Sequence, residues 1–435
     1  MNILFITHRY PHPPNRGDRI RSFHILKRLA ELGHVWLATQ YDETPSDESR
    51  QVLDALCEEV LLERWQPRKK WLRAGLSLLG GKTMTEGLFA NPRLASRLRD
   101  LAQRVPFDVV VCFCSSVFQY AEVVLRASAK KPRLIMDFVD IDSQKFFDYA
   151  EKTSRWSWKR VLYRTEGRRL RRLETQIEKA CDQLFAVTPE EVALFQRFCQ
   201  TDKLIPISNG VDTAYFDGTL PQFADVAEIP YRCVFVGAMD YHANVGGAEW
   251  FIHNVLPALR QRFPQAEFDV VGSKPAASLV HLCQNTPGAN LVGAVPDVRP
   301  YLKRASVVVV PLQVARGIQN KVLEACAMGK ATVVSPSAAE GIQTDISQKT
   351  SESSKNPSNP PFLVCETAEE WVKQVANLYE HGTLRKELAT AGRQLVEQSY
   401  GWSARLSVLE NFLSVTGRAE STPTTENQDD LSKTE

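Results

Sequence analysis

The sequence predicts an α/β protein made of two doubly wound parallel sheets, and three observations support that prediction. Short apolar stretches alternate with amphipathic stretches of helical period along most of the 435 residues, which is typical of βαβ units. The alternation stops once, over Asp212–Pro230. A chain of this length also exceeds what one hydrophobic core usually serves. We therefore expect two Rossmann-like domains that face a central cleft, with ligands at the carboxyl ends of the strands.

The first half should begin with a strand over Asn2–Ile6, then a loop, then an amphipathic helix over about Arg19–Leu32. The loop THRYPHPPNRGDR contains Gly17 but lacks the Gly-x-Gly-x-x-Gly fingerprint of dinucleotide-binding folds. A single glycine at the carboxyl end of a strand lets the backbone approach a ligand. A plain strand-to-helix loop is the alternative interpretation.

A second candidate region follows the predicted strand Arg133–Phe138, where the chain reads DFVDIDS. An Asp-x-Asp pair after a strand can hold a divalent metal ion under a nucleotide diphosphate. It can equally cap the next helix, with Asp142 or Ser143 as the capping residue. We favour capping for Asp142 and keep Asp140 as a candidate for catalysis or acceptor contact.

Two basic segments carry tryptophans. Arg64–Arg73 has two of them, and between Glu151 and Arg172 nine Lys or Arg residues accompany only two Glu, with Trp156, Trp158 and Tyr163 interleaved. The second segment belongs to a predicted helix over Trp156–Ala180. A basic helix that bears tryptophan is typical of a protein that binds an anionic membrane surface. A solvated charged face is the alternative.

The second half repeats the alternation of strands and helices. Its elements are expected to be the strand Arg232–Val236 followed by Gly237, a helix from about Asn244 to Phe263, the strand Glu267–Val271 followed by Gly272 and Lys274, and the strand Ala289–Val292 followed by a loop with Val295. A glycine after a strand again permits a close approach between backbone and ligand.

The stretch Pro311–Pro336 is the best candidate site, because it reads as a strand, a loop with Arg316 and Gly317, a helix over about Gln319–Met328, the C′ residue Gly329, and a strand. A helix N-terminus offers free N–H groups and a partial positive charge to a phosphate.

Asn320 and Lys321 fall in the first turn of that helix. A lysine there opposes the helix dipole, and a bound diphosphate would explain its presence. Glu324 shares the face of both residues and could accept hydrogen bonds from a ribose diol. A solvated Lys–Glu pair is the alternative.

Composition excludes several classes of protein. The net charge of +2 gives no footprint of nucleic-acid binding. The chain contains no apolar run of the length, about 18 residues, that a membrane span requires. The N-terminus reads as a strand and not as a signal peptide. Cys112 and Cys114 have no second pair to complete a zinc site, so reduced thiols in the cytosol fit best.

Taken together, several stretches resemble the retaining GT-B glycosyltransferases of family 4, of the group 1 type, over nearly all of residues 1–415. They are PHPPNRGDRIRSFHILKRLAELGH, SNGVD, VFVGAMDYHANVGGAEWF, VGAVPDVRPYLKRASVVVVPL, GIQNKVLEACAMGKATVV and the closing YGW. The first and the fifth are most similar to the subgroup associated with bacterial exopolysaccharide and the PEP-CTERM/exosortase system.

The resemblance implies a domain organisation and an activity. The domains are an acceptor-side domain over 1–210, a linker over 211–230, a donor-binding domain over 231–398, a helix over 399–416 that crosses back to the first domain, and a disordered tail over 417–435. We expect a mobile loop over Ile346–Pro361. The implied reaction moves a sugar from a nucleotide diphosphate sugar to a hydroxyl of a glycan or lipid-linked glycan, without a metal or other cofactor.

The resemblance also assigns roles to residues on matching positions. Glu324 would hold the ribose hydroxyls, Val295 would contact the nucleobase through its main chain, and Gly17, Gly237, Gly317 and Asn320 would approach the diphosphate and sugar. The chain departs from the family in three places. Arg316 stands where a second glutamate is usual, Asn244 where a basic residue is expected, and DFVD where many members have a histidine.

These departures leave Lys321, with Arg316 or Lys274, as the source of positive charge for the diphosphate. Lys321 and the helix N–H groups would stabilise the leaving diphosphate without a metal, and Asp140 is the nearest substitute for the histidine. A sugar-nucleotide epimerase on the same fold is one alternative. A non-catalytic nucleotide-sugar binder within a polysaccharide assembly complex is another.

Overall fold

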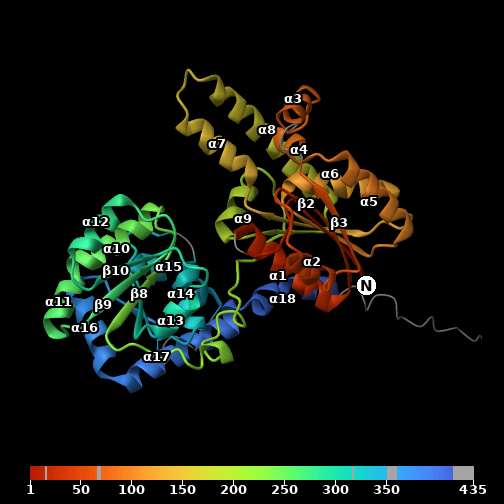
Figure 1. Cartoon of the computed structure of the whole chain (residues 1–435). Helices are drawn as coiled ribbons and strands as arrows, with labels where there is room; N and C mark the ends of the chain where they lie inside the picture. The colour runs from red at the N-terminus through yellow and green to blue at the C-terminus, as the bar shows by residue number, and fades with distance from the viewer. Residues whose placement is uncertain (15–16, 66–69, 316–317, 350–359, 415–435) are drawn as a thin grey trace, which may run out of the picture. The chain divides into compact units, whose positions relative to one another are not determined.

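The computed structural model describes residues 1–14, 17–65, 70–315, 318–349 and 360–414. Contacts between Cα atoms divide the described residues into two compact units, one of residues 1–208 with residues 406–414, the other of residues 209–405. Each unit is an α/β domain with its own parallel sheet (Figure 1). Arg316, Gly317, residues 350–359 of the expected mobile loop and the tail from Gly417 lie outside the described residues.

The first domain contains a seven-stranded sheet in the order β3-β2-β1-β4-β5-β6-β7. Every neighbouring pair in it is parallel. Its strands are β1 Asn2–Thr7, β2 His34–Tyr41, β3 Glu59–Arg64, β4 Val109–Phe113, β5 Arg133–Val139, β6 Gln183–Ala186 and β7 Leu204–Pro206. Ile3 of β1 lies between Val35 and Val109. The chain therefore builds outward from β1 in one direction and then, from β4, in the other.

Helices connect these strands. They are α1 Gly17–Leu32, α2 Asp47–Asp54, α3 Lys70–Leu79, α4 Met84–Phe89, α5 Pro92–Arg104, α6 Phe118–Ala127, α7 Asp142–Lys152, α8 Trp158–Ala180 and α9 Pro189–Gln196. The last helix of the described residues, α18 Trp402–Ser414, packs here from Leu406 onward. In it, Glu410 pairs with Arg28, and the Phe412 carbonyl accepts a hydrogen bond of 3.2 Å from Arg133.

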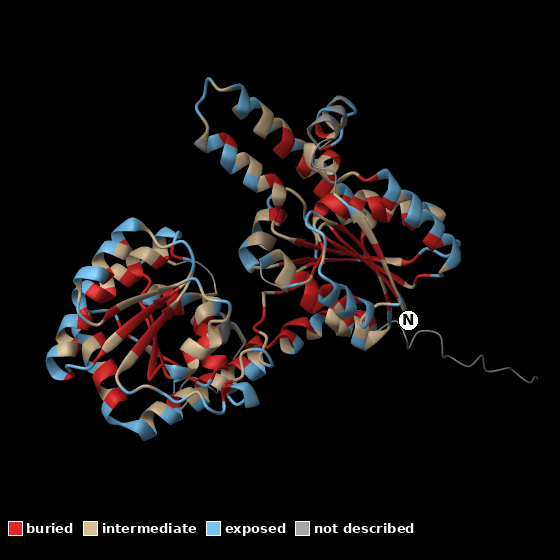
Figure 2. Cartoon of the chain, in the orientation of Figure 1, coloured by how far each residue is buried: buried red, intermediate tan, exposed pale blue. Residues whose placement is uncertain are grey.

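The second domain contains a six-stranded parallel sheet in the order β10-β9-β8-β11-β12-β13. Its strands are β8 Arg232–Val236, β9 Glu267–Val271, β10 Ala289–Gly293, β11 Val307–Val310, β12 Thr332–Val334 and β13 Leu363–Val364. Its helices are α10 His242–Asn254, α11 Leu256–Arg262, α12 Ala277–Asn285, α13 Arg299–Arg304, α14 Asn320–Ala327, α15 Pro336–Lys349, α16 Ala368–Glu380 and α17 Gly382–Leu395. In both sheets the strands are largely buried (Figure 2). The expected fold class, two doubly wound α/β domains, is confirmed.

The sequence prediction differs from the structure at several boundaries. The helix expected over Asn244–Phe263 is two helices, because Pro257 cannot donate the hydrogen bond that would continue α10. Residues 346–349, expected in a loop, form the end of α15. Gly329 has a φ of +65°, which confirms it as the glycine that ends α14.

The aperiodic segment Asp212–Pro230 is packed on the second domain. Phe223 is buried, and the partly buried Phe216 and Leu220 join it against Leu302 and Met328. The segment has no helical or strand periodicity because a few separate apolar side chains hold irregular backbone on the surface of the domain.

Candidate functional site

In the second domain the strand order reverses between β8 and β11, and ligands of doubly wound sheets bind outside the carboxyl ends of the strands at such a point. Gly237 follows β8 directly, and α14 enters after β11. The stretch that the sequence singled out therefore lies at the topological switch point of its sheet.

Three neighbouring strands of this sheet end in glycine. Gly237, Gly272 and Gly293 stand at the ends of β8, β9 and β10. The Gly237 N–H donates to the carbonyl of Val271 at 3.0 Å, and the Gly272 N–H donates to the carbonyl of Gly293 at 2.8 Å. A Cβ atom at position 272 would lie 1.6 Å from the Gly237 carbonyl oxygen. The edge is therefore bare backbone, and at Gly237 and Gly272 it is packed too closely for a side chain.

Lys321 reaches this glycine edge through Asn244. The Lys321 Nζ donates to Oδ1 of Asn244 at 3.1 Å, and Nδ2 of Asn244 donates to the carbonyl of Ala238 at 2.9 Å. Asn244 is buried, and a Cβ atom on Gly237 would lie 2.8 Å from its Nδ2. The asparagine thus ties the loop after β8 to the first turn of α14 and holds the ammonium group beside the glycine edge.

Electrostatics couple Lys321 to Glu324 within α14. Burial lowers the pKa of Lys321, and Glu324 opposes that change. Burial raises the pKa of Glu324 to about 7, and Lys321 opposes that change. Each charge is therefore costly in the ligand-free protein. A phosphate near the helix N-terminus would favour the charged lysine, and a diol would give the carboxylate two hydrogen-bond donors.

Three other predicted donor-site residues belong to α14 and to loops that follow strands of the same domain. Asn320 is the exposed first residue of α14. Lys274 is mostly exposed, and its Nζ lies 3.5 Å from Oδ2 of Asp240. Val295 is partly buried in the loop after β10. The structure thus brings Gly237, Asn244 and Lys321 together, whereas Lys274 pairs with Asp240 and Val295 packs in a separate apolar cluster.

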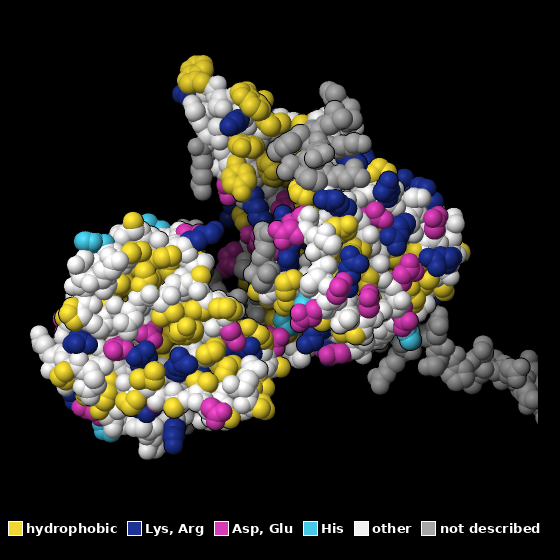
Figure 3. Space-filling view, in the orientation of Figure 1, with side chains coloured by type: hydrophobic (Ala, Val, Ile, Leu, Met, Phe, Trp, Pro, Cys, Tyr) yellow, Lys and Arg dark blue, Asp and Glu magenta, His cyan; other side chains and the backbone are white. Residues whose placement is uncertain are grey.

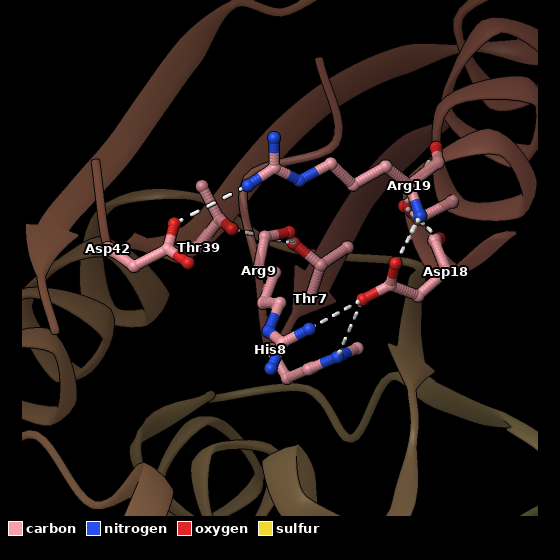
Figure 4. A network of polar contacts seen from close by, with 8 residues as sticks. Thr7, His8, Arg9, Asp18, Arg19, Thr39 and Asp42 are labelled. Atoms are coloured by element: carbon pink, nitrogen blue, oxygen red, sulfur yellow. Dashed lines mark hydrogen bonds and ion pairs between the residues drawn. The ribbon is translucent and has the colours of Figure 1, made fainter. Parts of the chain in front are cut away.

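The first domain has a group of polar side chains around a very small pocket at its own switch point, where sequence reasoning found only Gly17. Gly17 is the exposed first residue of α1. His8 directly follows β1, and its Nε2 lies 3.6 Å from Oδ2 of Asp18, which also accepts from Arg9 at 3.1 Å (Figure 4). The imidazole stacks on Phe113, at the end of β4, with 5.8 Å between centroids.

The side chains of this pocket come from several elements. It is lined by His8, Arg9, Gln40, Tyr41, Asp42, Trp65 and Phe89. Arg19 closes one side with a hydrogen bond of 3.4 Å to Asp42 (Figure 4). The available sequence signal was a histidine immediately after the first strand, in the letters THRY. Its partner Asp18 could be assigned only after the loop had been placed.

Asp140 lies in a charged cluster after β5. Its Oδ2 is 2.8 Å from Nζ of Lys145, which also lies 3.4 Å from Asp142. Burial alone would lower the pKa of Lys145, but Asp142 and Asp140 outweigh it and raise that pKa well above its usual value. Val139 has a φ of +66°, a strained conformation for a β-branched residue. Such strain is often found beside functional residues.

The prediction that Asp142 caps α7 is wrong. The N-cap residue is Ile141, without a side-chain cap, and Asp142 instead accepts a hydrogen bond of 2.8 Å from the Ser115 hydroxyl. Carboxylates from other helices satisfy the free N–H groups. Glu191 accepts from Ile141 at 2.6 Å, and Glu174 accepts from Ser143 at 2.9 Å. Tertiary packing therefore supplies the cap that local sequence suggested.

Comparison with known proteins places these observations in a family context. Residues 230–381 match the family model described as "Glycosyl transferases group 1". A curated relative, an uncharacterized 44.6 kDa protein in the cps region of Klebsiella pneumoniae, is 21% identical over 274 residues. That match covers 62% of this chain and 64% of the relative, so the chain spans less than two thirds of that relative's length.

Solved structures resemble the whole fold. Anabaena HepE in complex with UDP has a TM-score of 0.59 at 13% identity, covering 95% of this chain and 100% of that one. Sucrose-phosphate synthase from Thermosynechococcus elongatus has a TM-score of 0.58 at 14% identity, covering 96% and 100%. WaaG, a glycosyltransferase involved in lipopolysaccharide biosynthesis, has a TM-score of 0.55 at 15% identity, covering 94% and 99%. The fold is that of GT-B glycosyltransferase structures, and within it residues 230–381 match the model of group 1 glycosyltransferases.

Proposed function

We propose that this protein is a retaining, metal-independent glycosyltransferase. It transfers a sugar from a nucleotide diphosphate sugar to a hydroxyl of a cell-surface glycan or of its lipid-linked precursor. The observation that supports this most strongly is the contact between Lys321 and Asn244 beside the glycine edge, at the switch point of a domain that matches group 1 glycosyltransferases.

In this proposal the second domain holds the donor and stabilises the leaving group. Backbone N–H groups at Gly237 and at the first turn of α14 approach the diphosphate, and Lys321 neutralises charge that develops as the glycosidic bond breaks. Fixed dipoles and one ammonium group do this without reorganisation, so a metal ion is not required. Glu324 accepts hydrogen bonds from the ribose diol.

The first domain supplies the acceptor side. Asp140 directly follows the strained Val139 at the end of β5, and His8 lies at the switch point between β1 and β4. Either residue can exchange a proton with a hydroxyl group. The acceptor hydroxyl would attack on the face that the diphosphate leaves, so the configuration at the anomeric carbon is retained without a covalent sugar–enzyme intermediate.

The similar proteins suggest which substrates to test first. HepE has been solved with UDP-glucose, which makes a uridine donor the first choice for this chain. The Klebsiella relative is encoded in a cps region, which supports a role in exopolysaccharide or capsule synthesis. We further propose that the enzyme works in the cytoplasm at the inner face of the plasma membrane, where lipid-linked precursors are available.

A thermal-shift panel tests the donor assignment. The protein is heated with UDP, GDP, ADP or CMP and with their common sugars, with EDTA or with a divalent ion. A ligand that binds only the folded state raises the midpoint by mass action. We expect one uridine nucleotide to raise it selectively and equally in both buffers. No shift from any nucleotide would reject the donor site.

Donor hydrolysis separates an enzyme from a binder. Wild-type protein is incubated with the sugar nucleotide that gives the largest shift, and release of the free nucleotide is followed over time. We expect slow hydrolysis without an acceptor. Binding without any hydrolysis or transfer would instead identify a non-catalytic nucleotide-sugar binder.

A further inference from the structure

The helical hairpin formed by α7 and α8 extends away from the sheet of the first domain (Figure 1). Its turn spans residues 153–157, where Ser157 caps α8 by accepting a hydrogen bond of 3.3 Å from the Lys159 N–H. Phe146, Tyr149 and Tyr163 pack between the two helices, with ring centroids 5.9–6.1 Å apart. This aromatic contact holds the hairpin together and so keeps its tip in a defined position.

The tip of the hairpin is unusually apolar for a surface. Trp156, Trp158 and Val161 are 90%, 69% and 67% exposed, and Tyr149 is 51% exposed. These are four of the ten large apolar side chains that are exposed in the described residues, and they lie within one short segment. Hydrophobic side chains accordingly gather at the projecting end (Figure 3). Exposed apolar clusters of this kind mark interaction sites.

The outer face of α8 changes from apolar to basic along the helix. Its exposed positions recur at spacings of up to four residues, as expected for one helical face. They are Trp158, Lys159, Val161, Arg164, Arg168, Arg172, Gln176 and Lys179. None of these eight is acidic, and all of α8 is described. Near the tip, Glu151 of α7 is an exposed carboxylate.

A shallow groove continues this basic face toward α9. It is lined by Phe147, Arg168, Arg171, Arg172, Thr175, Gln176, Lys179 and Phe198. The Arg171 guanidinium lies 4.6 Å from the ring centroids of both Phe147 and Phe198, so its orientation is fixed. Four cations without a carboxylate in the lining make this groove suitable for the phosphate of a lipid headgroup.

We propose that the α7–α8 hairpin is a membrane anchor that inserts its tryptophan tip into the interface of an anionic bilayer, while the basic face of α8 and the groove bind lipid phosphates. Tryptophan is favoured at the headgroup level, where its ring is apolar and its N–H can be hydrated. Each Lys or Arg near an anionic surface strengthens the electrostatic attraction to it. The apolar tip and the basic face of α8 follow one another along the same side of the hairpin. An apolar end beside a row of cations suits a bilayer better than a nucleic acid.

The anchor deepens the proposed function, because it would carry the enzyme to a lipid-linked acceptor, but vesicle binding needs no turnover. Full-length protein is sedimented with vesicles of neutral phosphatidylcholine or with vesicles that also contain phosphatidylglycerol. We expect binding to the anionic vesicles that weakens as salt is added. Vesicles with brominated acyl chains should quench tryptophan fluorescence, since bromine reports contact with the hydrocarbon.

Two paired variants test the two parts of the anchor. Trp156→Ser/Trp158→Ser should lower the partition coefficient about tenfold and abolish most of the quenching. Arg168→Gln/Arg172→Gln should lower it by a similar factor and flatten the salt dependence. The matched controls are Tyr241→Ser, which removes an exposed aromatic of the second domain, and Arg126→Gln, which removes an exposed cation of α6.

Several results would overturn the anchor. One is binding of the wild-type protein to neither kind of vesicle at low salt, and another is unchanged binding of the tryptophan variant. Duplex DNA binding that the arginine variant loses, without vesicle binding, would assign the face to nucleic acid. A dimer that dissociates in the tryptophan variant, again without vesicle binding, would assign it to self-association. The nucleotide thermal shift, measured without vesicles, reports separately on the donor site.

Discussion

The two domains have the same kind of parallel sheet but opposite kinds of edge at their switch points. In the second domain, strands β8, β9 and β10 end in Gly237, Gly272 and Gly293, and backbone packs against backbone. In the first domain the residues after β1, β4 and β5 are His8, Cys114 and Asp140, none of which is glycine. There the edge is formed by side chains in ion pairs and ring contacts.

The difference shows how one topology can serve two tasks. A glycine edge lets a ligand reach backbone N–H groups, which suits a diphosphate that is always charged. A side-chain edge places groups that can exchange protons, which suits a hydroxyl acceptor. The first edge also carries local strain, because Cys114 and Val139 both have positive φ at 75° and 66°.

The largest effect should come from removing the ammonium group of the donor edge. Lys321→Ala should lower turnover by about 10²–10³-fold, because one preorganised electrostatic contact to a leaving group has about that value. The thermal midpoint should change little, since burial already disfavours the charge of Lys321. Turnover is measured as release of free nucleotide at saturating donor.

The matched control is Lys303→Ala. Lys303 lies on α13 of the same domain, away from the glycine edge. Its Nζ donates a hydrogen bond of 2.8 Å to the carbonyl of Gly218. It should retain wild-type turnover. Wild-type turnover in Lys321→Ala itself would remove the lysine from the mechanism.

A smaller effect should follow from adding one methyl group to the glycine edge. In Gly237→Ala the new Cβ would lie 2.8 Å from Nδ2 of Asn244 and would displace the side chain that holds Lys321. We expect about tenfold weaker nucleotide binding, which is about 1.4 kcal/mol. Calorimetric titration measures it. Gly246→Ala is the control, because a Cβ there would meet nothing within 4 Å. Equal affinities of the two variants would contradict this role of Asn244.

The third effect depends on pH and comes from Glu324, whose pKa is raised to about 7. As pH rises through that value the acid becomes a carboxylate, which can accept from both ribose hydroxyls. Affinity for a sugar nucleotide should therefore rise a few-fold between about pH 6 and about pH 8. The stability of the ligand-free protein should change with pH in the opposite direction. The folded state keeps a proton that the unfolded state has lost, so stability falls as pH rises from 4.5 to about 7.

Two variants separate the affinity effect from other titrations. Glu324→Gln should bind the donor independently of pH in this range. Glu174→Gln should keep the wild-type dependence of affinity, because Glu174 lies in the first domain, although its own pKa is raised to about 8 by burial. Measuring affinity and unfolding in parallel assigns each titration to its domain. A pH dependence that persists in Glu324→Gln would refute the ribose assignment.

The smallest effect on donor binding should come from the first-domain edge. His8→Gln and Asp140→Asn should each leave nucleotide affinity within about twofold of wild type, because both residues belong to the first domain and the donor cluster belongs to the second. Both should lower transfer to the acceptor. The nucleotide thermal shift and the transfer rate are measured on the same samples. A lost thermal shift in either variant would break the division between donor and acceptor sides.

Much of this architecture could be predicted from sequence. Apolar period and glycine positions placed the strands, the helix α14 and its C′ residue Gly329, because burial and positive φ leave direct traces in residue type. The same reasoning failed for Asp142. A short-range pattern cannot tell whether a carboxylate caps its own helix or turns to Ser115 while Glu174 and Glu191 provide the cap.

The sequence by itself determined the fold class, the two domains and the choice of Lys321 and Glu324, since each follows from local period or from spacing within one helix. Only the tertiary structure decided that Lys321 meets Asn244, 77 residues away in the chain. It also decided that His8 meets Asp18 and Phe113, and that a tryptophan-bearing helix forms an exposed hairpin tip. Contacts between distant segments depend on strand order and on which side of the sheet each connection crosses, and no local pattern encodes these.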